Sequence, residues 1–234
     1  FSNIGGKFEG QGPLADFFDE ISNDSFFGEK TWEKAESAMQ KTVLQRALEK
    51  AELTPEDLDY ILAGDLLNQC IGSSFGLRDF RVPFYGLYGA CSTMGESLSL
   101  ASLLIDGGYA DRAAALTSSH FCTAERQYRM PVPYGSQRTP TAQWTTTAAG
   151  CTILGSDGPG PYVTHVTCGR IVDKGITDAN NMGAAMAPAA YDTLSAFFRD
   201  TGYKPADFDL ILTGDLGELG HAIVRDFFQR DGVD

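Results

Sequence analysis

The sequence predicts an α/β protein made of two duplicated halves, in which a mixed or parallel sheet is covered by helices on both faces. Two observations predict this fold class. A helix-turn-strand unit occurs twice, and apolar strands alternate with amphipathic helices along the first half. The chain has 234 residues, 43% of them hydrophobic, so it has enough apolar side chains to fill the core of such a fold.

The repeat is the clearest of these signals. Residues 51–66 read AELTPEDLDYILAGDL and residues 201–216 read TGYKPADFDLILTGDL, an offset of 150 with eight of sixteen positions identical. Each copy follows an apolar helical stretch, Thr42–Lys50 or Tyr191–Asp200, and passes through a Pro-Asp turn into a strand. We expect an N-terminal half over 1–167 and the start of a C-terminal half over 168–234. On this offset a full second half would need roughly 70 more residues, so we expect it to be incomplete in this chain.

The remaining elements of the first half follow from apolar runs and glycine breaks. In chain order the sequence predicts a strand at Pro83–Tyr88, a helix at Thr93–Ile105 stopped by Gly107 and Gly108, a strand at Ala113–Ser118, and strands near Ala148–Leu154 and Tyr162–Thr167.

Charge and cysteine content exclude several classes of function. Acidic residues outnumber basic ones by 31 to 18, and the net charge of −13 argues against nucleic acid or an anionic membrane as a direct partner. Five cysteines, an odd number, argue against a secreted disulfide framework and predict a reducing compartment. No apolar run approaches the roughly 20 residues of a membrane helix, so we expect a soluble or membrane-peripheral protein.

Cys91 is the first candidate for chemistry. It lies in YGACSTMGE, between a predicted strand and a predicted helix, and Thr93 with Glu96 has capping-box spacing. The N–H groups of a helix start lower the pKa of a thiol and attract anions. The position suits a nucleophile or a ligand contact, although a small thiol packed under a turn is also compatible with the sequence.

Residues 117–135 concentrate polar groups after a strand that we expect to end beside Cys91. The candidate ligand contacts there are Ser119, His120, Glu125, Arg126 and Arg129. Guanidinium groups bind carboxylates with two hydrogen bonds, so the two arginines suit a dicarboxylate. Surface ion pairs with nearby acids are the alternative.

Two other patterns carry little weight. Residues 72–76 fit the G-x-S-x-G pattern of serine hydrolases, but no strand runs directly into them. His120 and Cys122 have no second ligand pair at metal spacing, so we expect no metal site.

Several segments together resemble the thiolase and ketoacyl-synthase superfamily, and within it a family of thiolase-fold proteins from spore formers. The segments are DLDYILAGDL, FYGLYGACSTMGESL, AAGCTIL, LAGDLLNQ, TSSH with TAERQ, GITD with NMG and AMAPAA, and DLILTGDL, which cover nearly the whole chain. The resemblance implies a thiolase-like fold with layered α/β/α/β/α packing. It places Cys91 at the position of the superfamily's nucleophile.

The resemblance also carries functional expectations. Condensing enzymes of the superfamily place a histidine where this chain has Gly214, which implies a protein without catalytic residues and without a cofactor. The sporulation family is implicated in moving dipicolinic acid, pyridine-2,6-dicarboxylate, into the developing spore. The resemblance therefore implies a dipicolinic acid binder inside the forespore, peripheral to the spore inner membrane, with membrane proteins of the same transport system as partners, and a homodimer. An active acyltransferase using Cys91 and a scaffold that binds no small molecule are the alternatives.

Overall fold

The structure is a computed structural model that describes residues 1–67, 69–128, 141, 143–178 and 180–233. The chain forms two compact units. The first comprises residues 1–135 and 145–163, and the second comprises residues 136–144 and 164–234.

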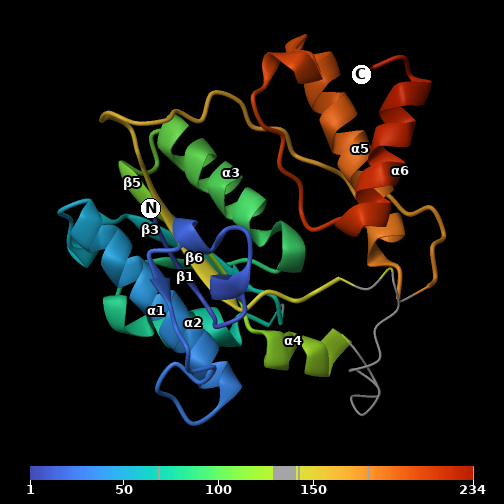
Figure 1. Ribbon diagram of the computed structural model, residues 1–234. Coiled ribbons are helices and arrows are strands. Elements are labelled where there is room, and N and C mark those ends of the chain that lie inside the picture. The colour runs from blue at the N-terminus through green and yellow to red at the C-terminus, as the bar shows by residue number, and fades with distance from the viewer. Residues whose placement is uncertain (68, 129–140, 142, 179, 234) are drawn as a thin grey trace. The chain divides into compact units, whose positions relative to one another are not determined.

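The first unit is built on a mixed six-stranded sheet with the order β2-β1-β6-β5-β3-β4. Figure 1 labels β1, β3, β5 and β6 of this sheet. Strands β4, β3 and β5 are parallel, whereas β6 is antiparallel to both β5 and β1. The α/β prediction is therefore confirmed. The strands are β1 (Ser2–Gly5), β2 (Glu20–Ile21), β3 (Tyr60–Asp65), β4 (Phe84–Gly86), β5 (Arg112–Ser119) and β6 (Ala148–Gly155).

Helices lie against both faces of this sheet. Helices α1 and α2 pack on one face and α3 packs on the other, while α4 follows directly after β5 (Figure 1). The helices are α1 (Trp32–Lys50), α2 (Ile71–Leu77), α3 (Thr93–Asp106) and α4 (Phe121–Tyr128).

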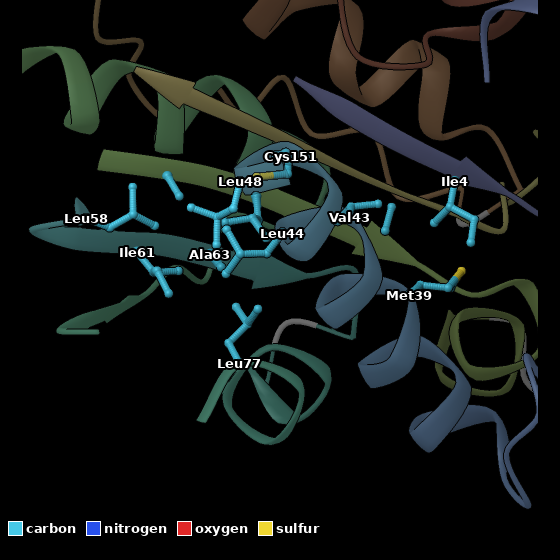
Figure 2. Packing of buried hydrophobic residues seen from close by; sticks show 14 residues of the cluster. Ile4, Met39, Val43, Leu44, Leu48, Leu58, Ile61, Ala63, Leu77 and Cys151 are labelled. Carbon is cyan, nitrogen blue, oxygen red and sulfur yellow. The ribbon is translucent and has the colours of Figure 1, made fainter. Parts of the chain in front are cut away.

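The alternation of side chains along β3 explains how both faces are filled, because successive strand residues point to opposite sides. Ile61 and Ala63 join the main core, where they meet Leu44 and Leu48 of α1 (Figure 2). Leu62, between them, belongs to a separate cluster on the α3 side. Because both faces of β3 are buried, its sequence is a continuous run of apolar residues and does not alternate between apolar and polar residues.

The second unit contains α5 (Met182–Thr201) and α6 (Gly217–Arg230), which pack against each other. Helix α5 repeats the capping of α1. The Thr31 side chain caps α1 and the Asn181 side chain caps α5, each by accepting a hydrogen bond from a backbone N–H of the first turn.

The turn after each helix is repeated as well. The short 3-10 turns Pro55–Asp57 and Pro205–Asp207 follow α1 and α5. The Asp57 carboxylate accepts from the Thr54 N–H at 2.8 Å, and the Asp207 carboxylate accepts from the Lys204 N–H at 2.8 Å. These caps and turns recur at the offset of 150 that the sequence shows, so the duplicated helix-turn unit is confirmed.

Two predicted strands are wrong. Residues 162–167 form no strand, and neither do residues 208–216, the second copy of β3. Leu212 is 80% exposed, whereas Leu62, its counterpart in β3, is 1% exposed. Strand β3 is held between β4 and β5, but no strand in the described ranges pairs with residues 208–216. An apolar segment becomes a strand only where another strand satisfies its backbone groups.

Candidate functional site

The carboxyl ends of β4, β3 and β5 lie at one edge of the sheet because the three strands are parallel. The chain leaves β4 at Gly86 and reaches Cys91 just before α3 begins. Strand β5 ends at Ser119, and β3 lies between β5 and β4. The segment after β5 therefore leaves the sheet two strand positions away from β4, about 10 Å along the edge.

Cys91 lies in a short 3-10 turn, Ala90–Ser92, and is exposed to solvent. The preceding Ala90 has a φ of +47°, in the left-handed region that alanine rarely adopts. The Ser92 hydroxyl donates to the Gly89 carbonyl at 3.0 Å and closes the turn. Backbone strain beside an exposed thiol is a feature that clusters at functional sites.

The end of β3 packs closely under this turn. A β-carbon on Gly64 would lie 2.9 Å from Thr93 Cγ2 and still closer to the Leu87 carbonyl oxygen. Only glycine leaves room for that approach, since neither the backbone at Leu87 nor the buried Thr93 has space to retreat. Gly64 thereby fixes β3 against the segment that carries Cys91.

The capping box predicted from Thr93 and Glu96 is wrong. The helix begins at Thr93 and its N-cap is Ser92, which makes no side-chain capping hydrogen bond. Thr93 is fully buried, and no group in the described part of the chain forms a hydrogen bond with its hydroxyl. The tight contact with Gly64 requires Thr93 to point inward, so its hydroxyl is not available to cap the helix.

Two predicted ligand residues are engaged within the protein. The Ser119 hydroxyl donates to the Thr146 carbonyl. His120 is 1% exposed, and its Nε2 lies 2.8 Å from the Ser25 carbonyl oxygen. Its Nδ1 accepts from the Cys122 N–H at 3.2 Å, which assigns the proton of a neutral ring to Nε2. Burial lowers the pKa of His120.

The other predicted ligand residues lie outside what the structure describes. Glu125 and Arg126 belong to α4, but their side chains are outside the described part of the chain, as is the whole of Arg129.

A buried polar network that the sequence analysis missed lies on the α1 side of the same sheet edge. Gln40 of α1 donates from Nε2 toward the Gly64 carbonyl at 3.2 Å, Ser73 Oγ at 3.0 Å and Ser118 Oγ at 2.7 Å. Ser73 in turn donates to Asp65 through its hydroxyl at 3.0 Å and its N–H at 3.2 Å. The network therefore ties α1 and α2 to the ends of β3 and β5.

Glu36 is the second acid of this network. It accepts from the Ser118 hydroxyl at 2.9 Å and lies 3.2 Å from the Thr123 hydroxyl. Burial raises the pKa of Glu36 to about 7, and the nearby Asp65 charge adds to the increase. The signal available in the sequence was the spacing of Glu36 and Gln40, which puts two polar residues on the inward face of an otherwise apolar helix.

The second unit holds Gly214, the position at which the resemblance to condensing enzymes predicts a histidine. Gly214 lies in the segment before α6, which forms no strand, and a β-carbon added there would meet nothing within 4 Å. His221 lies in α6, exposed, beside a hollow of about 300 Å³ lined mostly by apolar side chains such as Phe198, Ile211 and Phe228.

The described side chains contain no group of three or more histidine, cysteine, aspartate or glutamate residues arranged to hold a metal ion. Among the described helices, none combines the length and apolar character needed to cross a bilayer.

The chain has a thiolase-like fold, in which parallel strands end at a strained cysteine turn that is followed by a helix. Solved structures share this fold. The chain superposes on 3-oxoacyl-[acyl-carrier-protein] synthase III from Aquifex aeolicus with a TM-score of 0.55 and 15% identity, covering 85% of this chain and 66% of that one. It superposes on a cerulenin-bound variant of OleA from Xanthomonas campestris with a TM-score of 0.60 and 13% identity, covering 85% and 63%.

Sequence comparison identifies the family. The profile of stage V sporulation protein AD matches residues 1–234. The stage V sporulation protein AD of Bacillus subtilis is 45% identical over 228 residues, which are 97% of this chain and 67% of the relative. The chain belongs to the stage V sporulation protein AD family, and it spans about two thirds of the length of that relative.

Proposed function

We propose that this protein binds dipicolinic acid without transforming it and assists uptake of that ligand into the developing spore. One observation carries the proposal. The family match extends over residues 1–234, while Gly214 occupies the position at which condensing enzymes of this class place a histidine.

The chemistry of the exposed turn is compatible with an anionic ligand. A dianion that enters a protein of net charge −13 needs local positive potential to replace its lost hydration. The start of α3 at Cys91 supplies backbone N–H groups, and the sequence places Arg126 and Arg129 in the polar segment after β5. Guanidinium groups recognise carboxylates with paired hydrogen bonds.

The absence of catalysis is part of the proposal. A condensing reaction at Cys91 needs a base that orients the thiolate and a donor for the developing oxyanion. Gly214 has no side chain. Both ring nitrogens of His120 are already hydrogen-bonded, Nε2 to the Ser25 carbonyl and Nδ1 to the Cys122 N–H. The alternative function is an acyltransferase of the condensing class, because the structural neighbours named above include 3-oxoacyl synthases and the thiol of Cys91 is exposed.

Calorimetric titration with dipicolinate tests the binding proposal. We expect saturable binding of dipicolinate by the wild type. The affinity should fall by about ten- to a hundredfold in Arg126→Ala, because that substitution removes one charge-assisted hydrogen bond to the ligand. Arg230→Ala is the matched control, since Arg230 pairs with Asp226 on the surface of α6. Absence of heat with the wild-type protein, or equal affinity of both arginine variants, would contradict the proposed site.

Intact-protein mass spectrometry separates the binder from the acyltransferase. After incubation with acyl-CoA we expect no mass increase, because Gly214 supplies no base at the position where condensing enzymes have a histidine. A mass increase that is present in the wild type and lost in Cys91→Ala would establish the enzyme alternative.

The proposal extends to partners and location. We propose that the protein acts as a homodimer, peripheral to the spore inner membrane, beside membrane proteins of the same sporulation transport system. Strand β4 is an outer strand of the sheet, and Tyr85 in it is 49% exposed, which supports an edge open to a second copy.

A further inference from the structure

Glu36 and Asp65 form a buried carboxyl pair at the sheet edge. They are 1% and 0% exposed, and no ion pair joins either acid to a cation in the described ranges. A β-carbon on Gly72 would lie 3.4 Å from Asp65 Oδ2 and 3.6 Å from Glu36 Cδ, so both acids border one small space. Two carboxylates in one buried space cannot both remain charged at low cost.

The hydrogen-bond network around the pair contains more acceptors than donors. Gln40 Oε1 and Asp65 Oδ1 are buried, and no group of the described chain donates to either. The hydroxyl hydrogens of Ser73 and Ser118 are already directed to Asp65 and Glu36. A buried network that has more hydrogen-bond acceptors than donated hydrogens is stabilised by binding one additional proton.

Thr123 shows where that hydrogen belongs. Its hydroxyl carries one hydrogen but has two acceptors in reach, the His120 carbonyl at 2.9 Å and Glu36 Oε2 at 3.2 Å. When the hydroxyl donates to the nearer His120 carbonyl, its oxygen faces Glu36 Oε2 with lone pairs. A proton on Glu36 Oε2 turns that contact into a hydrogen bond from Glu36 to Thr123.

We propose that Glu36 is protonated in the folded protein at neutral and lower pH, and that this proton latches the first turn of α4 to α1. Thr123 lies in the first turn of α4, and Glu36 lies in α1. Loss of the proton leaves the single hydroxyl hydrogen of Thr123 to be shared between the His120 carbonyl and Glu36 Oε2, adds repulsion between Glu36 and Asp65, and loosens α4 from the sheet edge. Helix α4 is thus held by a pH-sensitive contact.

The charged neighbours are consistent with this direction. The acids that act on Glu36 are Asp65 from β3 and Glu33 from α1, and both favour the protonated form. Among the described side chains, the groups that approach it from β5 and α4 are the neutral hydroxyls of Ser118 and Thr123. The remaining close element, α2, presents Gly72.

Infrared spectroscopy tests the proton directly. We expect the carbonyl band of a protonated buried carboxyl at about pH 6, and its loss as pH rises above about 8. The band should be absent in Glu36→Gln and retained in Glu49→Gln, a matched substitution at an exposed position of the same helix. Asp65→Asn removes the like charge, so the band should titrate at lower pH than in the wild type.

Hydrogen exchange of the α4 amides tests the latch. The protection factors of α4 in the wild type should fall severalfold as the carboxyl band disappears, and those of Glu36→Gln should be independent of pH, because the amide donates to Thr123 at any pH. A wild type without the carboxyl band at about pH 6 overturns the proposal. So does α4 protection that changes with pH equally in both proteins. If Glu36→Gln does not fold, the wild-type and Asp65→Asn titrations still decide the question.

Discussion

The contact between Gly64 and the Cys91 segment gives the sharpest test of how this fold positions its candidate site. In Gly64→Ala the added methyl group would meet Thr93 Cγ2 at 2.9 Å and would overlap the Leu87 carbonyl oxygen. One of these atoms belongs to the backbone, and the other belongs to a fully buried side chain. Relief therefore requires β3 and the chain before α3 to separate.

The expected cost follows from that geometry. Overpacking by one methyl group in a close-packed interior costs about 1–3 kcal/mol, and a backbone obstacle places this site at the upper end. We expect Gly64→Ala to lower the free energy of unfolding by about 2–3 kcal/mol. The separation should also make Cys91 react severalfold faster with a thiol reagent, measured in a Cys168→Ser background because Cys168 is the other exposed cysteine.

The duplication supplies the matched control. Gly214 occupies the same position in the second copy of the motif, and a β-carbon there would meet nothing within 4 Å. Gly214→Ala should change the free energy of unfolding by less than about 0.5 kcal/mol. Both variants would be compared by urea denaturation followed by circular dichroism. Equal unfolding midpoints for the two variants would show that the close approach at Gly64 does not constrain the fold.

Three further predictions follow from other contacts. The raised pKa of Glu36, about 7 against 4.5 in the unfolded chain, means that only the folded state holds this proton between those values. The free energy of unfolding should therefore fall by on the order of 3 kcal/mol as pH rises through that window, and denaturation of Glu36→Gln should lack this slope. The Asp59 carboxylate accepts the N–H groups of Asp111 at 2.7 Å and Arg112 at 3.0 Å, and these bonds lower its pKa. Thermal unfolding of the wild type should thus shift to lower temperature as acidification protonates Asp59, and Asp59→Asn should show a smaller shift. Finally, Tyr85→Lys on the outer strand should reduce the dimer fraction seen in analytical ultracentrifugation, whereas a wild-type protein that sediments as a monomer would contradict the dimer.

The elements that the sequence predicted correctly are those determined by local signals. The helix at Thr93 follows from a periodic apolar face ended by glycines, and the structure has it at Thr93–Asp106. The strand at Ala113–Ser118 follows from a continuous apolar run, and the structure has it at Arg112–Ser119. The turn at Pro55–Asp57 follows from a proline and a side chain that caps it from three residues away.

The contacts of the candidate site could not be predicted from local sequence signals, because they join residues that lie far apart in the chain. The sequence drew attention to His120 as a polar residue near a strand end, but burial against Ser25 decides which partners its ring nitrogens have. The local sequence does not distinguish Glu36 from a solvated residue, because an acid on a helix is ordinarily exposed. Only the approach of β5 and α4 to α1 encloses it with Ser118 and Thr123.

The duplicated units separate what the sequence by itself determined from what tertiary structure decided. Sequence alone determined the repeated caps and turns, since each is made by atoms within a few residues of one another. The two copies of ILxGDL share that local chemistry, yet residues 60–65 are a buried strand and residues 208–216 are not. Strand β3 pairs with β4 and β5, and these partners satisfy its backbone groups and bury its side chains. A strand is a property of the sheet around it, because its hydrogen bonds run to other segments, whereas the bonds of a helix or a turn run within its own.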